Sequence, residues 1–344
     1  MIATTPVARW AWGRDDETAD VLVRCLTHLL TAYAVLATHR LAEGEPVVRV
    51  AVTEARVSNS RLFDGELDAA TEVRDPAKTT SVVAHLTEKV RTGLRPGEIG
   101  AMTASTKWSG TVVADAERKE VLQKGLFQLG ATSFGDFITV DLVTCTDVWL
   151  PFDLKGRPQP EIYAVNAPRL GVALHELSEA LESETDPDDP TYFAKPTTTG
   201  AENFFDSDGK TSDVWGSFEV PSRYDVFRHA PGFGRIGYRR SADGNVQYVP
   251  VRNPRGEVLG YLWASDAENA ASFEPRDVGD DATYRIGLTW LERLRSAYDR
   301  GLLPSDALAE LSALHGEKGA GQVAPASESR TTALAVLRED AAGR

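Results

Sequence analysis

The sequence predicts an α+β protein: an N-terminal mixed α/β domain with a long first helix, followed by a smaller domain with an antiparallel β-meander and a packed helix. Three observations predict this. Apolar residues recur at helical spacing over residues 15–42, and hydrophobic alternation follows at residues 47–56 and 137–148. Three short alternating runs then lie close together between residues 235 and 263. These patterns indicate a helix, half-buried strands and hairpins, respectively.

The mixed α/β domain is expected over residues 1–195. Acidic residues precede its first helix, and Gly44 and Pro46 follow it, which is the usual order of start and stop signals. Two short strands, at residues 99–106 and 111–114, are expected to pair through the turn between them. Further helices are expected at residues 80–91, 117–129 and 166–184. Helices that alternate with strands predict a sheet covered by helices.

Three segments complete the predicted domain layout. A stretch rich in Thr, Gly and Asp predicts an acidic connecting loop over residues 196–213. The smaller domain, a β-meander plus helices, is expected over residues 214–314, with helices at residues 280–300 and 305–314. The Gly-, Ala- and Ser-rich end, residues 315–344, is expected to be a flexible tail, in which residues 332–339 could form a terminal helical turn that docks on another part.

The meander has the clearest local signal in the sequence. Asp-Gly and Asn-Pro turn pairs separate its alternating runs. The three runs cover residues 235–240, 245–252 and 257–263. Pro250 lies in the middle run, where proline cannot donate a hydrogen bond to a neighbouring strand. We therefore expect either a bulge at this point or another strand that intervenes.

Composition restricts the class of protein. The chain has 344 residues and a net charge of −14, whereas a free-standing nucleic-acid binder needs a basic face. The two cysteines, Cys25 and Cys145, exclude a disulfide framework. Residues 1–14 show no signal-peptide pattern, and polar residues interrupt the longest apolar stretch, at residues 21–41. We expect a cytoplasmic protein that binds neither nucleic acid nor membrane.

Two patterns bear on chemistry. Residues 232–237 match G-x-G-x-x-G, but a dinucleotide site needs this pattern before a helix, and a strand is expected here, so we expect no cofactor. On the helix at residues 166–184, His175, Glu179 and Glu182 are spaced i, i+4 and i+7 and share a face. That spacing suits two or three ligands of a metal ion. The alternative is a solvated polar face, and we expect no metal there.

The negative charge is concentrated in one segment. Residues 176–213 hold eleven acidic residues and two lysines, and carry −9 of the total −14. Aromatic residues are interleaved with them, and a recognition surface for a basic partner needs such anchors and steering charge. The candidate partner-binding residues are Asp186, Asp188, Asp189, Tyr192, Phe193, Asp206 and Asp208. Alternatively, these carboxylates pair with the arginine-rich residues 214–255, are merely solvated, or collect a cation.

Three functions are compatible with these patterns, and none has a complete catalytic motif behind it. The first is a non-catalytic intracellular protein-binding module, similar in general terms to bacterial immunity or inhibitor proteins, whose partner is another, possibly basic, protein. The second is a metal-dependent hydrolase in which His175 and Glu179 hold a metal that activates water. The third is a structural or assembly component tethered by its C-terminal tail.

Overall fold

The chain divides into two compact units, which a computed structural model describes over residues 1–3, 5–57, 59–69, 78–114, 117–219, 222, 237–276, 281–314 and 321–342. The first unit is Thr4–Asp213 and the second is Val214–Arg344, with Met1 and Ala3 grouped with the second. Both units combine helices with antiparallel sheets, so the predicted α+β fold class is confirmed.

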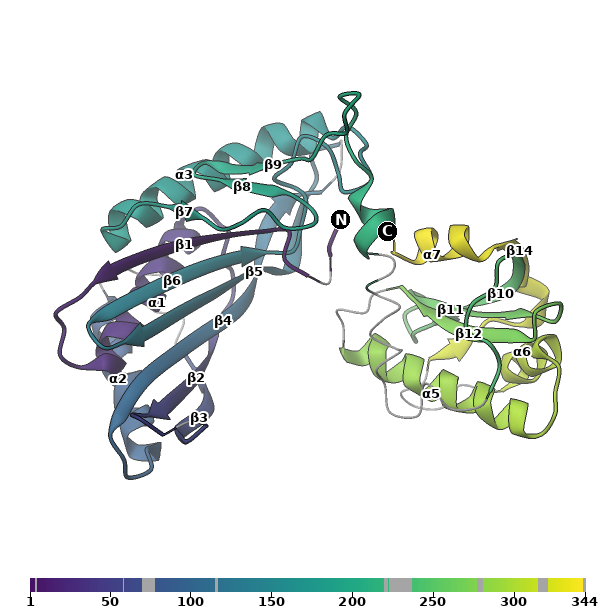
Figure 1. The fold of residues 1–344 in the computed structure, drawn as a ribbon, viewed down its shortest axis with the longest axis horizontal. Coiled ribbons are helices and arrows are strands. Elements are labelled where there is room, and N and C mark those ends of the chain that lie inside the picture. Colours follow the sequence, from purple (N-terminus) through teal and green to yellow (C-terminus); the bar gives the residue numbers. More distant parts are fainter. Residues whose placement is uncertain are drawn as a thin grey trace. The chain divides into compact units, whose positions relative to one another are not determined.

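A seven-stranded antiparallel sheet forms the first unit (Figure 1). Its strand order is β3-β2-β4-β5-β6-β1-β7, so the first strand of the chain lies beside the sixth. The strands are β1 (Ala8–Asp15), β2 (Val47–Glu54), β3 (Arg61–Asp68), β4 (Ile99–Val113), β5 (Glu120–Phe134), β6 (Phe137–Thr144) and β7 (Asp186–Pro187). A small hairpin of β8 (Lys195–Thr197) and β9 (Gly200–Glu202) follows.

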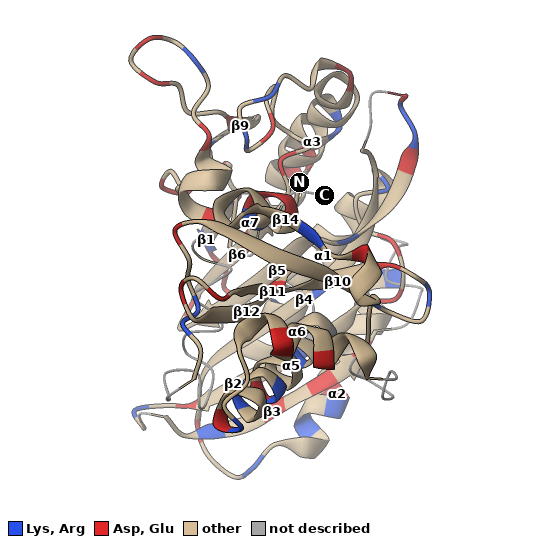
Figure 2. Cartoon of the chain, turned by 90° about the vertical axis from the view of Figure 1, so that its right-hand side faces the viewer, with Lys and Arg blue, Asp and Glu red and all other residues tan. Residues whose placement is uncertain are grey.

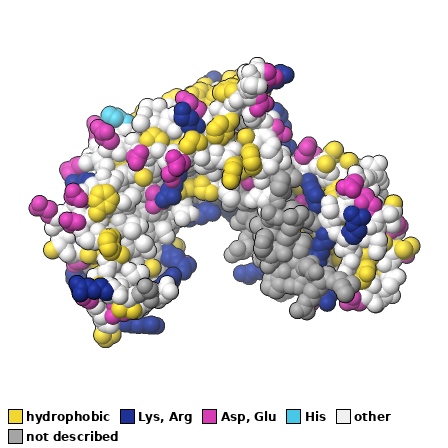
Figure 3. All heavy atoms as spheres, viewed as in Figure 1, with side chains coloured by type: hydrophobic (Ala, Val, Ile, Leu, Met, Phe, Trp, Pro, Cys, Tyr) yellow, Lys and Arg dark blue, Asp and Glu magenta, His cyan; other side chains and the backbone are white. Residues whose placement is uncertain are grey.

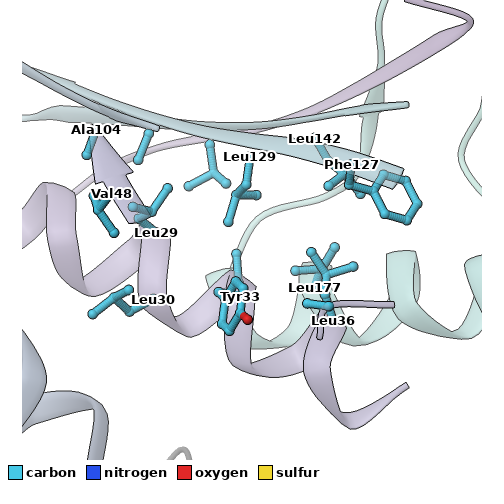
Figure 4. Packing of buried hydrophobic residues seen from close by; sticks show 14 of the residues in the cluster. Leu29, Leu30, Tyr33, Leu36, Val48, Ala104, Phe127, Leu129, Leu142 and Leu177 are labelled. Carbon is cyan, nitrogen blue, oxygen red and sulfur yellow. The ribbon is translucent and has the colours of Figure 1, made fainter. Parts of the chain in front are cut away.

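Three helices cover one face of this sheet: α1 (Val21–Thr38), α2 (Thr79–Gly93) and α3 (Pro160–Leu181). The side chain of Asp20 caps α1 by accepting hydrogen bonds from the backbone N–H groups of Leu22 and Val23. Figure 4 shows Leu29 and Tyr33 of α1 packed towards the strands. Among the described residues, α1 is the one helix long and apolar enough to suit a membrane span, but most of it is buried inside the unit.

The first helix covers Val21–Thr38 and is shorter at both ends than the predicted residues 15–42, and it is preceded by a strand at residues 8–15 that the sequence analysis missed. Ala8, Trp10 and Trp12 alternate with more exposed residues and are buried against the helices. Asp15 ends β1, and the chain turns before Asp20 caps α1. Of the acidic residues that suggested a helix start, Asp15 therefore ends the strand, and Asp16 and Glu17 lie in the connection to the helix.

Two further predictions for this unit are wrong. Residues 117–129, expected to be helical, lie largely in β5, because their apolar spacing also fits a strand and both β4 and β6 supply hydrogen-bonding partners. Residues 99–113 form one strand, not two. A bulge between Trp108 and Gly110 replaces the expected turn. A Cβ at Gly110 would lie 2.4 Å from the Leu41 carbonyl oxygen, so glycine is needed there for close approach.

A second antiparallel sheet forms the core of the other unit, with the order β12-β11-β10-β13 and β14 also paired with β10. Helices α5 and α6 cover one face, and α7 lies on the other. The strands are β10 (Asn245–Arg252), β11 (Val258–Ser265), β12 (Ala270–Pro275), β13 (Gln322–Val323) and β14 (Arg330–Ala333). The helices are α5 (Asp281–Asp299), α6 (Pro304–Ala313) and α7 (Leu334–Ala342), with short turns η3 (Trp215–Glu219) and η4 (Ala326–Glu328).

The meander is present, but its third strand is β12, which the sequence analysis missed. In the expected strand at residues 235–240, Arg239 makes only an isolated bridge to Ala270, and residues 235 and 236 lie outside the described part of the chain. The glycine pattern at residues 232–237 also lies outside it, except for Gly237.

Pro250 is accommodated by a gap between two strands. A bulge lies beside it, between Val251 and Arg252. Strand β11 lies along one edge of β10, and β14 and β13 share the other edge. There β14 pairs as far as Tyr248 and β13 from Val251 onward, so Pro250 lies where no backbone N–H is required for strand pairing.

The C-terminal residues do not form a flexible tail over the part that the structure describes. Residues 321–342 contribute β13, β14 and α7, and Leu334 and Leu337 of α7 are buried. Residues 315–320 lie outside the described part. Residues 196–213, expected to be a connecting loop, also have defined structure and are grouped with the first unit. They contain most of the β8–β9 hairpin. The Thr197 carbonyl accepts a hydrogen bond from Trp10 Nε1 at 2.8 Å.

Candidate functional site: the open face of the seven-stranded sheet

The sheet face opposite the helices carries small and polar side chains. Across this open face Ala11 of β1 lies opposite Asp141 of β6, which lies opposite Gly130 of β5, which lies opposite Ser105 of β4. A Cβ at Gly130 would lie 2.5 Å from Asp141 Oδ1, so the carboxylate lies directly over this glycine. The face is therefore shallow at its centre, and the row continues to β2, where Arg49 lies opposite Ser105.

Three carboxylates gather at the β7 end of this row. Asp186 of β7 lies opposite Ala11, so Asp186 and Asp141 flank Ala11 on the same face. Arg9 lies 3.5 Å from Asp188 and 3.9 Å from Asp141. We call Asp141, Asp186, Asp188 and Arg9 the acidic patch; its formal charge is negative because one guanidinium faces three carboxylates. Figure 3 shows acidic side chains beside basic and hydrophobic ones in this region of the first unit.

Asp141 has an unusual environment for a surface carboxylate. Only 21% of its side chain is exposed. Burial raises its pKa above the ordinary value, and the nearby charge of Asp188 raises the pKa further, whereas Arg9 opposes the shift. The ionised carboxylate is therefore held in a setting that would favour an added positive charge.

Replacing Asp141 by Asn is expected to raise the free energy of unfolding at neutral pH. Folding raises the pKa of Asp141, so the protonated carboxyl stabilises the folded state. This stabilisation is complete below the pKa of the unfolded state, and it is lost as the pH rises through the pKa of the folded state. The gain of Asp141→Asn should therefore be present at pH 7 and vanish in acid. Urea unfolding of both proteins across this pH range measures it, and a gain that persists unchanged in acid would contradict the expectation.

The structure does not place all the predicted binding residues on one surface. Asp189 follows the patch, and its backbone N–H donates to Asp188 Oδ1. Tyr192 is 71% exposed, but Phe193 is buried, so its assignment to a binding surface is wrong. The reason is local: Thr191 Oγ1 accepts hydrogen bonds from the backbone N–H groups of Phe193 and Ala194, and this turn directs Phe193 inward.

Asp206 and Asp208 belong to a separate loop after β9. Asp206 Oδ1 accepts a hydrogen bond from Ser212, and Asp208 pairs with Lys210 at 3.1 Å. The hydrogen bond from Lys210 lowers the pKa of Asp208. Figure 2 shows acidic and basic residues side by side on this loop. No hydrogen bond or ion pair between described residues joins it to the acidic patch, so the predicted set divides into two groups.

The three candidate metal ligands do not converge. His175 lies 3.6 Å from Glu179, and both side chains are largely exposed. Glu182 ends α3 in a left-handed conformation and pairs with Arg14 at 2.7 Å instead. Among the residues that the structure describes, no group of three or more His, Cys, Asp or Glu side chains could hold a metal ion.

Three carboxylates of the acidic segment pair with residues of the first unit. In the described residues Glu176 pairs with His39, Glu182 with Arg14 and Asp188 with Arg9. These three partners come from the N-terminal part of the chain. The sequence analysis missed Arg9 and Asp141 as site residues. The alternation of residues 137–148 did place Asp141 opposite the apolar face, and that was the available signal.

Comparisons with known proteins give no relative. No family model matches the sequence, no curated protein matches it, and no solved structure matches the chain. A function for this chain must therefore be inferred from the chemistry of its own residues.

Proposed function

We propose that the first unit is a non-catalytic binding module for a basic segment of another protein, which docks on the open sheet face over the acidic patch. The observation that carries this proposal is the arrangement in which Asp141 and Asp186 flank Ala11, with Asp188 beside them and Arg9 as the cation of the acidic patch. A cationic side chain placed there would pair with carboxylates that Arg9 alone leaves undercompensated.

The shape of the face supports a chain as the occupant. Small residues along the row leave a shallow surface on which an extended segment can approach the sheet closely. Aromatic anchors are available near both ends of the strands: Phe134 and Phe137 are paired across the β5–β6 hairpin and are 68% and 44% exposed, and Tyr192 follows β7. Exposed aromatic residues around a charged centre are typical of protein-recognition surfaces.

A charge-reversal experiment tests this function. Fluorescence anisotropy is measured with a labelled peptide of alternating lysine and leucine and with its glutamate counterpart. We expect the basic peptide to bind, the acidic one not to bind, and the double variant Asp186→Lys, Asp188→Lys to weaken binding by about tenfold or more, which corresponds to roughly 1.4 kcal/mol. Binding should also weaken as salt is raised, because exposed charges are screened.

The matched control is the double variant Asp206→Lys, Asp208→Lys, which makes the same change in charge on the loop after β9. It should bind the basic peptide almost as well as the unaltered protein, apart from a small loss due to net charge. If both double variants lose the same affinity, the acidity is non-specific and the patch is not the site. Equal binding of the acidic and basic peptides would also refute the proposal.

A further inference from the structure

The second unit contains a cavity of about 660 Å³ on the sheet face that carries α7. Helix α7 covers only part of that face, because its buried Leu334 and Leu337 pack with Val246 and Trp263. Beyond this contact the face remains open between β10, β11 and the segment from η4 to β14. The lining residues that bear on its chemistry are Tyr248, Tyr261, Arg252, Glu328, Arg330 and Asp340.

Two tyrosines form the apolar part of this tyrosine cavity. The rings of Tyr248 and Tyr261 meet edge to face, with centroids 5.5 Å apart and planes at 86°. Pro250 and Val258 extend the apolar surface. Burial raises the pKa of Tyr261, so its hydroxyl stays protonated and can donate a hydrogen bond at neutral pH. A flat apolar group would find both a ring edge and a ring face here.

The charges around the cavity divide into a matched pair and two unmatched groups. Arg252 and Glu328 pair with each other at 3.3 Å. Arg330, at the start of β14, and Asp340, on α7, both line the cavity, and neither side chain has an ion-pair or hydrogen-bond partner among the described residues. One cation and one anion that have no partner within the described part of the chain therefore border the same apolar surface.

We propose that the tyrosine cavity binds a small zwitterionic ligand with an aromatic body, of the class of short peptides with free termini. The ligand's carboxylate would pair with Arg330, its ammonium group with Asp340, and its aromatic side chain would pack on the tyrosines. The volume lies in the usual range of ligand pockets, about 300–1,000 Å³, and leaves room for more than one amino-acid residue. This site lies in the second unit and does not depend on the acidic patch.

Isothermal titration calorimetry tests the proposal on the full chain. The probes are phenylalanylglycine, its N-acetyl form, its C-amide form and glycylglycine. We expect phenylalanylglycine to bind, and glycylglycine to bind most weakly. Each blocked form should bind about threefold to tenfold more weakly than phenylalanylglycine, because it loses one partly exposed ion pair.

Variants assign each charge to its partner. In Asp340→Asn the N-acetyl form should bind as well as the free dipeptide, whereas in Arg330→Gln the C-amide form should do so. Two control variants neutralise exposed charges outside the cavity: Glu339→Gln, next to Asp340 on α7, and Arg255→Gln, in the β10–β11 turn. In both controls the free dipeptide should still bind more tightly than either blocked form. The proposal is overturned if phenylalanylglycine does not bind, if blocking the termini has no effect, or if the controls behave like the cavity variants.

Discussion

Replacing Tyr33 by alanine is expected to lower the free energy of unfolding of the first unit by about 3–5 kcal/mol, the usual cost of removing a large buried ring. Tyr33 is completely buried at the centre of α1, and its ring meets Trp108 of β4 edge to face at 5.2 Å. Its hydroxyl donates to the Gly44 carbonyl at 3.0 Å, which holds the turn after α1. One side chain thus joins the helix, the sheet and the following loop.

Hydrogen exchange of the α1 amides measures this effect, because it reports on the first unit even if the two units unfold separately. Tyr33→Phe is the matched control: it keeps the ring and loses only the hydroxyl, so it should cost about 1 kcal/mol. If the two variants cost the same, the hydrogen bond to Gly44, and not the ring packing, would be the dominant contribution.

Replacing Leu337 by alanine is expected to lower the free energy of unfolding of the second unit by about 2–5 kcal/mol. Leu337 is 1% exposed and packs with Val246 and Trp263 on the sheet face that α7 covers. A free tail would show no such cost, so this variant distinguishes a docked C-terminal segment from a flexible one.

Val336→Ala provides the control for that experiment. Val336 precedes Leu337 on α7 and is 45% exposed, so its truncation should change the stability by less than about 0.5 kcal/mol. Hydrogen exchange of the β10 and β11 amides measures both variants, because four of the seven tryptophans lie in the first unit and fluorescence would report on both units. Equal effects at the two positions would mean that α7 is not docked through its Leu337 face.

Much of the fold could be predicted wherever a segment has one clear periodicity. Strands β2, β6, β10 and β11 and helices α2, α3 and α5 lie close to their expected positions, because their apolar spacing fits only one kind of element. Residues 117–129 were misassigned because their spacing fits both kinds, and pairing with β4 and β6 decides between them. Residues 8–15 form a strand whose main partner, β6, lies more than a hundred residues away.

The candidate site was predicted only in part, for a similar reason. Asp186 and Asp188 were singled out by their local charge density, which a sequence displays directly. Arg9 and Asp141 join them only because β1 lies between β6 and β7 in the sheet. Phe193 looked like an exposed anchor in the sequence, but a turn formed through Thr191 places it in the interior.

The sequence by itself determined that this protein has an α+β fold and that its negative charge is concentrated in residues 176–213. Both are properties of local composition and spacing. The tertiary structure decided which carboxylates share a surface, that the C-terminal segment packs as β14 and α7, and that Arg330 and Asp340 border one cavity. These features depend on strand order and on packing between distant segments. No local pattern specifies them, because strand pairing and burial are settled by the whole chain.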